Sequence, residues 1–310
     1  MRIATFNAYE GVITNLQSRQ RGLQNSQEQL TSGKRVSKPS DDPVAAARAE
    51  RALAEVTRAD AHQRALEAAR TNTKLTESAL GDAGELIQQA REAIVSAGNA
   101  SYTDKERQNL VNSLTLVRQQ LLSVANRSDG TGGYLFGGQG GAQRPFRDDA
   151  DGVGVVYQGE TGNAMVASDE QLSTHLDGRQ VWLQATAADG TNSLSLFDVV
   201  DRAIVALGAG NISDVDRKAA VSSGLAELDR FNDHLLAVRA SSGGSLNRMD
   251  SVELRIADSK LASETERSNA EDLDLVQAIS DFQSRQTGYD AALKAYSMVQ
   301  RMSLFNYIGG

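Results

Sequence analysis

The two ends of the chain carry matching apolar stripes, each with the spacing of one narrow helical face. The N-terminal stripe consists of Phe6, Tyr9, Ile13, Leu16, Leu23 and Leu30, with Gln20 and Gln27 in the same series. The C-terminal stripe consists of Leu275, Ile279, Phe282, Tyr289, Leu293 and Tyr296, with Gln286 and Gln300 in the same series. Two such stripes can bury each other. The pattern therefore predicts a subunit whose termini pair as a coiled coil and whose middle loops outward.

Glutamine on a coiled-coil seam weakens the pair but fixes its register, as expected of helices that settle only beside neighbouring subunits. We expect no further part of the chain to cover these stripes on both sides. We therefore predict a subunit-packing seam made of Phe6, Ile13, Leu16, Leu23, Leu30, Leu275, Ile279, Phe282, Tyr289, Leu293 and Tyr296. The regular stripes at 110–124 and 221–238 are instead expected to be ordinary core faces.

Composition favours long packed helices over a compact enzyme, because aromatic residues make up only 5% of the 310 residues. Cysteine is absent, which excludes disulfides and cysteine metal sites. The net charge of −8 argues against general nucleic-acid binding. No secretory signal or membrane span is visible, which taken alone predicts a cytoplasmic protein.

Signals for helix starts and ends divide the chain into segments. The first helix is expected to break at 32–40, and Asp41-Asp42-Pro43 starts an alanine-rich helix that reaches about Leu80. Thr103 to Glu106 is a capping box. Glycines at 243 and 244 predict a turn at 241–244, and a near-continuous helix is expected from Leu246 to about Leu304.

Glycine is concentrated in the middle, with 12 of the 27 glycines between residues 130 and 178. Apolar runs at 153–157 and 180–183 predict strands of a small antiparallel β domain, with Trp182 in its core. The domain is expected to hang from the helices as a removable module, reached through a flexible segment at 137–141. The predicted fold is mainly α with a small β insertion, a long helical bundle or coiled coil being formed by the N- and C-terminal segments.

Three parts are predicted. Residues 1–35 plus 272–310 form a terminal coiled-coil polymerisation domain, 36–134 plus 190–271 a helical body, and 135–189 a small β insertion domain.

The acidic cluster Asp148, Asp149 and Asp151 is the best enzymatic candidate, because carboxylates at this density can bind a cation or act as an acid and a base. The spacing does not fit a calcium loop, and a solvated turn explains the cluster better. We predict no catalytic, cofactor or metal site, and no enzyme activity.

Longer motifs carry a family resemblance. Residues 31–43, Thr-Ser-Gly-Lys-Arg-Val-Ser-Lys-Pro-Ser-Asp-Asp-Pro, resemble the segment after the first helix of flagellins and their relatives. Within that superfamily the chain is more similar to the hook-associated protein 3 family, the hook–filament junction proteins. This likeness rests on the Met-Arg-Ile start, on 126–138 with Pro145-Phe146, and on Met-Ser-Leu-Phe at 302–305.

The resemblance implies a structural subunit with a flagellin-like fold, placed between hook-associated protein 1 and the flagellin filament in a ring of its own copies. It also implies an export chaperone and the flagellar type III export apparatus as partners. The chain would then be extracellular, secreted without a cleaved signal peptide. Two alternatives stay open: a filament flagellin, or a surface-exposed metal-dependent enzyme that uses residues 148–151.

Overall fold

The computed structural model describes residues 2–99, 102–140, 142–149, 154–165, 172–187, 190, 193–209 and 213–308, with the backbone alone given for 2–9 and 299–308. The chain divides into two compact units, residues 1–60 with 257–310 and residues 61–256. None of the described helices combines the length and the apolar character needed to cross a membrane.

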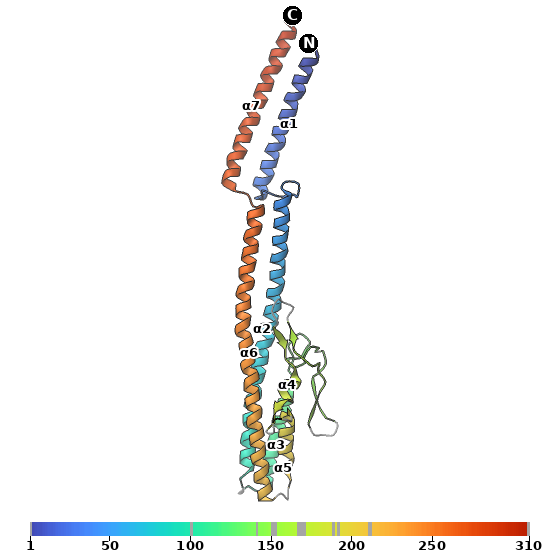
Figure 1. The fold of residues 1–310 in the computed structure, drawn as a ribbon, viewed down its shortest axis with the longest axis vertical. Coiled ribbons are helices and arrows are strands. Elements are labelled where there is room, and N and C mark those ends of the chain that lie inside the picture. Colours follow the sequence, from blue (N-terminus) through green and yellow to red (C-terminus); the bar gives the residue numbers. More distant parts are fainter. Residues whose placement is uncertain are drawn as a thin grey trace. The chain divides into compact units, whose positions relative to one another are not determined.

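The first unit contains both ends of the chain. Helices α1 (Arg2–Ser32) and α7 (Leu275–Ile308) lie side by side in antiparallel directions, so that the two termini meet at one end of the pair (Figure 1). The start of α2 (Pro43–Ala97) and the end of α6 (Asp214–Glu271) complete this unit. The predicted pairing of the terminal segments as helices is confirmed.

Two connectors, residues 33–42 and 272–274, separate the terminal helices from α2 and α6 and bind each other. The Leu273 N–H donates to the Gly33 carbonyl at 3.0 Å, and the Arg35 N–H donates to the Glu271 carbonyl at 2.7 Å. Gly33 has a φ of +70°, which ends α1 in the left-handed region where glycine is favoured. The break after α1 was predicted, but the near-continuous helix from 246 to 304 was wrong. Asp274 starts α7 by accepting hydrogen bonds from the N–H groups of Val276 and Gln277.

The second unit is built on the remainder of α2 and α6 with α3 (Asp104–Ala125) and α5 (Leu196–Gly208). The predicted capping box at Thr103 and Glu106 is present. Helix α2 continues to Ala97, well beyond the expected end near Leu80. Helix α6 runs through 241–244 without interruption, so the predicted turn there was wrong.

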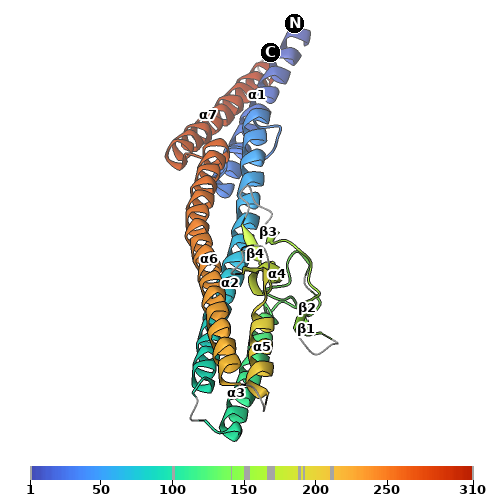
Figure 2. The same cartoon turned by 60° about the horizontal axis from the view of Figure 1, so that its bottom comes forward.

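Short strands lie on one side of these helices (Figures 1 and 2). They form three antiparallel pairs: β1 (Phe146–Asp148) with β2 (Val155–Tyr157), β3 (Ala164–Met165) with β4 (Ser173–His175), and β5 (Ala185–Thr186) with β6 (Ser193–Leu194). The run at 180–183, predicted as a strand, belongs instead to helix α4 (Gly178–Trp182). Asp177 caps this helix, because its side chain accepts a hydrogen bond from the Arg179 N–H.

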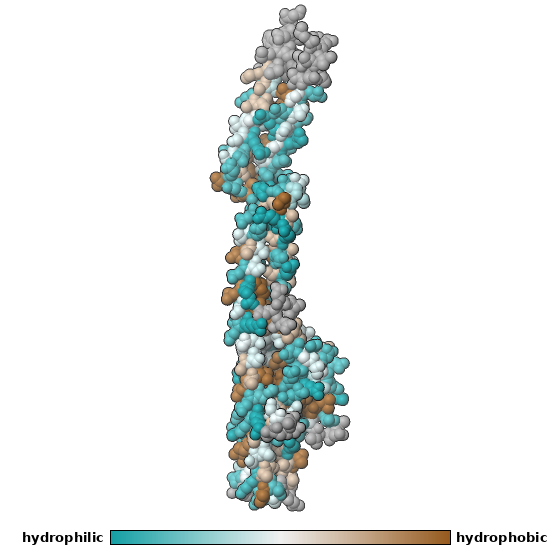
Figure 3. Space-filling model, viewed as in Figure 1, coloured by the Kyte–Doolittle hydropathy of each residue, from teal (hydrophilic) through white to brown (hydrophobic). Residues whose placement is uncertain are grey.

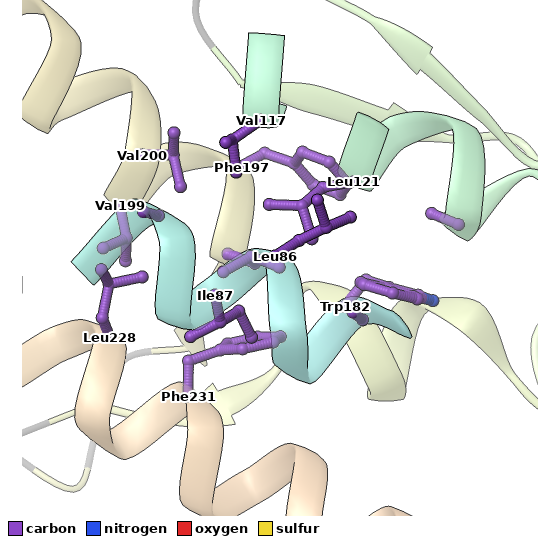
Figure 4. Close-up of a cluster of buried hydrophobic side chains, with 14 of the residues drawn as sticks. Leu86, Ile87, Val117, Leu121, Trp182, Phe197, Val199, Val200, Leu228 and Phe231 are labelled. Atoms are coloured by element: carbon purple, nitrogen blue, oxygen red, sulfur yellow. The ribbon is translucent and has the colours of Figure 1, made fainter. Parts of the chain in front are cut away.

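The strands have no separate core of their own among the described residues. Trp182 and Phe146 are fully buried in one cluster with Ile87 of α2, Phe197 of α5 and Phe231 of α6. Figure 4 shows Trp182 beside side chains from these helices. The Phe136 and Trp182 rings meet edge to face with centroids 5.2 Å apart. The expectation of a removable module with Trp182 in its own core is therefore wrong.

Gly138 and Gly140 of the predicted flexible segment are packed closely against Glu160, and Gly141 lies outside the described residues. Gly138 has a φ of +72°, and a Cβ added there would lie 1.7 Å from the Glu160 carbonyl oxygen. The Gly138 N–H donates to the Leu176 carbonyl at 3.2 Å. Glycine is needed here because two backbone segments touch.

Candidate subunit-packing surface

The N-terminal stripe is only partly covered by α7. Leu16, Leu23 and Leu30 are half-buried, while Ile13 is 43% exposed. Phe6 lies where the backbone alone is described. The predicted stripe therefore faces the partner helix without being enclosed by it.

The C-terminal stripe shows the same incomplete cover. Phe282, Tyr289 and Tyr296 are half-buried. The other three residues of the predicted seam remain between 41% and 52% exposed: Leu293, Ile279 and Leu275. Among the side chains described in α1 and α7, Ser26 alone is buried. The terminal pair has no buried apolar core in the described part, and its apolar side chains keep exposed surface that further burial would cover.

Further exposed apolar side chains lie on the same two helices. Val12, Val276 and Met298 are exposed, Val276 to 83%. Sequence reasoning missed them because they stand outside the heptad series. Val12 stands four residues before Leu16 and so widens the N-terminal stripe, whereas Val276 and Met298 face away from the C-terminal stripe. Figure 3 shows scattered brown, hydrophobic positions on a mainly hydrophilic surface.

Polar groups hold the centre of the contact between α1 and α7. Arg285 Nη1 donates to the Gly22 carbonyl at 3.0 Å, and the Ser26 hydroxyl donates to the same oxygen at 3.0 Å. The seam glutamines Gln20, Gln27 and Gln286 are all exposed. The polar contact between the two helices is therefore made by Arg285 and Gly22, and not by the seam glutamines as the sequence predicted.

The acidic cluster is engaged in structural contacts. Asp148 accepts a hydrogen bond from Arg118 Nη1 at 2.6 Å, and Arg118 also binds the nearly buried Asp201. These carboxylates raise the pKa of Arg118 despite its burial. The Asp149 N–H donates to the Gly154 carbonyl at 3.3 Å, and Asp151 lies outside the described residues. The described part of the chain contains no group of three or more residues suited to hold a metal.

A second buried carboxylate fixes the loop after α3. Asp129 accepts hydrogen bonds from the N–H groups of Thr131 at 2.7 Å and Gly133 at 2.9 Å, and its Oδ2 lies 3.1 Å from His175 Nε2. Burial raises the pKa of Asp129, but the hydrogen bonds from Thr131, His175 and Gly133 outweigh it and lower the pKa to about 2. This carboxylate, whose side chain is only 3% exposed, anchors β4 to the loop.

Comparison with known proteins identifies the family. The bacterial flagellin N-terminal helical region matches residues 3–140. Flagellar hook-associated protein 3 of Salmonella typhimurium is 32% identical over 98% of this chain and 99% of its own length. The chain belongs to the flagellar hook-associated protein 3 family.

More distant similarities agree with that assignment. The crystal structure of the flagellar junction protein FlgL from Legionella pneumophila matches with a TM-score of 0.59 at 18% identity, over 73% of this chain and all of that one. Flagellin of Bacillus subtilis is only 22% identical, over 91% of this chain and 90% of its own. Members of the family are structural, non-enzymatic proteins of the bacterial flagellum, so the enzyme alternative is rejected. The assignment as a hook-associated protein is supported over the assignment as a filament flagellin.

Proposed function

We propose that this chain forms the junction between hook-associated protein 1 and the flagellin filament, as a ring of its own copies. One observation carries the proposal: α1 and α7 pair with each other and leave large apolar side chains at their surface half-exposed. An apolar stripe of this kind marks an interaction site in a soluble protein. The occupants are the same helices in neighbouring flagellar subunits.

The energetics favour ordering upon assembly. Full burial of a leucine or isoleucine side chain contributes about 1.5 to 3 kcal/mol, and Ile13, Ile279 and Leu293 have gained only part of this in the single chain. Isolated helices are marginal in water without tertiary packing. The eleven predicted seam residues are therefore the residues that we assign to subunit packing.

The division of labour follows the predicted parts. Residues 1–35 plus 272–310 form the polymerisation domain, 36–134 plus 190–271 the helical body, and 135–189 the β insertion on the outer surface. Terminal segments that order late also suit passage as an unfolded chain through the flagellar type III export apparatus, with an export chaperone. The mature location is then extracellular, in the flagellum, with no membrane insertion.

The test replaces Leu293 by Asp, which puts a charge on the assembly face, with Leu293→Met as the matched control because it conserves volume. We expect Leu293→Asp to be secreted with an unchanged Tm but to shed filaments into the medium. Leu293→Met should retain them. A large fall in Tm would place Leu293 in the fold of the single chain instead.

The position within the flagellum is tested separately, by immunogold labelling of purified flagella. We expect label at the hook–filament junction. Label along the filament would support a flagellin role, and absence from purified flagella would reject a structural role in the organelle.

Mobility before assembly gives a further test. In a verified monomer we expect the α1–α7 pair to be the major state but to open often, which gives rapid amide exchange across 10–30 and 275–298 and protection in α3 and in the core segments of α2 and α6. Strong protection of either terminal helix would contradict ordering upon assembly.

A further inference from the structure

Two short segments of the terminal helices share one sequence pattern. Residues 19–22 read Arg-Gln-Arg-Gly in α1, and residues 285–288 read Arg-Gln-Thr-Gly in α7. In each segment the arginine stands three positions before the glycine. Residues three apart lie on the same face of a helix, so each face offers one long cation and one gap.

Each arginine lies against the glycine of the other segment. Arg285 Nη1 donates to the Gly22 carbonyl at 3.0 Å. A Cβ added to Gly288 would lie 3.1 Å from Arg19 Nη1, and one added to Gly22 would lie 3.4 Å from Arg285 Nη1. Because α1 and α7 are antiparallel, three residues forward along one helix correspond to three residues back along the other. Both contacts therefore belong to a single register.

We propose that these two Arg-Gln-x-Gly segments form a reciprocal lock that sets the register in which α1 pairs with α7. At Gly22 the missing side chain leaves the helix backbone open, and the Arg285 guanidinium binds the carbonyl oxygen there. At Gly288 it leaves room for the Arg19 guanidinium, whose Nε donates to Asn15 Oδ1 of its own helix at 2.9 Å. Gly11, in the same helix, has nothing within 4 Å of an added Cβ. The close approach is thus a property of Gly22 and Gly288, and not of every glycine in these helices.

The apolar stripes alone leave the register ambiguous. They repeat every seven residues, so a slip of one repeat, about 10 Å along the helix, again sets apolar residues opposite one another. None of the described apolar side chains of α1 or α7 is buried, so close apolar packing does not select one register. After such a slip Arg285 would face Asn15 or Gln29 in place of Gly22, and the side chain there would cover the carbonyl.

The experiment exchanges the two members of one contact. Gly288→Arg alone sets two guanidinium groups against each other. The double variant Arg19→Gly with Gly288→Arg restores one arginine over one glycine in the same register. Gly11→Arg is the control, because that position is open.

The chain has no native cysteine. Spin labels can therefore be attached at Gln27→Cys and Ala291→Cys, two exposed positions offset along the pair, so that a slip changes their separation.

Distances between the labels are measured by pulsed electron resonance in the purified, full-length protein. We expect one narrow distance peak in the parent and in Gly11→Arg, loss or displacement of that peak in Gly288→Arg, and its return in the double variant. The fluorescence of Trp182, the single tryptophan, reports that the other unit stays folded. A parent peak that survives in Gly288→Arg, a double variant without the peak, or no narrow peak in any variant overturns the lock.

If the terminal pair packs against neighbouring subunits as proposed above, its register should also affect assembly, which filament retention measures. Filament retention should be lost in Gly288→Arg and regained in the double variant. If the distances follow the lock while filaments are retained equally by all variants, the lock stands and the proposed function of the terminal pair fails.

Discussion

Arg118 holds together the helices and the first strand pair of the second unit, so its removal should be costly. Its side chain is 12% exposed and that of Asp201 is 10% exposed. Arg118 Nη2 donates to Asp201 Oδ2 at 3.0 Å and to the Gly154 carbonyl at 3.2 Å. In Arg118→Met, Asp201 would keep the Gly154 N–H at 2.9 Å but lose its counter-charge. Breaking a buried ion pair in this way costs about 3 to 5 kcal/mol.

A unit of this size loses roughly 2 to 4 °C of Tm per kcal/mol, so we expect a fall of roughly 6 to 20 °C. Thermal unfolding followed by the fluorescence of Trp182 measures it directly, because this tryptophan is fully buried in the same unit. Asp148→Asn is the matched control. Asp148 is 57% exposed and should contribute no more than about 1 kcal/mol. A loss below about 1 kcal/mol in Arg118→Met, or an equal loss in Asp148→Asn, would contradict this role of Arg118.

Three further outcomes are expected. The pKa of Asp129 lies below its ordinary 3.8, at about 2. The ionised carboxylate therefore stabilises the fold above pH 4, and this effect is lost as the pH falls towards 2. Urea titration should show Asp129→Asn about 2 kcal/mol less stable than the parent at neutral pH and equal to the parent near pH 2. Replacing Gly243 and Gly244 by alanine, where an added Cβ meets nothing within 4 Å, should raise the unfolding free energy by about 1 kcal/mol each; no gain would mean that the helix needs both glycines. Deleting 140–186 removes Phe146 and Trp182 from the core, so circular dichroism should show loss of cooperative unfolding, and a deletion variant with the Tm of the parent would contradict the shared core.

Local signals in the sequence were sufficient for much of the helical fold. The capping box at Thr103 and Glu106 and the proline at the first residue of α2 each depend on neighbours within a few residues. The stripes of the terminal helices also follow from spacing alone. These features could be predicted because hydrogen bonds and periodicity within one helix determine them.

Features determined by distant contacts could not be predicted in the same way. Ser241 to Gly244 are poor helix formers, yet packing of α6 at Leu235 and Met249 on either side keeps the stretch helical. The break at 272–274 depends on hydrogen bonds with residues 33–35, more than 200 positions away. Trp182 could be recognised as buried, but the cluster that it joins includes Ile87 of α2 and Phe231 of α6, which are far apart in the sequence. For the candidate surface, spacing identified the stripe, whereas the degree of exposure required the partner helix.

The paired connectors between the terminal helices and α2 and α6 have a mechanical consequence. Both helical backbones are interrupted at the same level, and the Lys34 ammonium with Glu271, as well as the backbone bonds of Gly33 and Arg35, tie the two interruptions together. Bending at this level strains no helical hydrogen bond, because none crosses it. Bending is thereby confined to the two connectors, residues 33–42 and 272–274. The helices on either side can remain straight while the flagellum flexes.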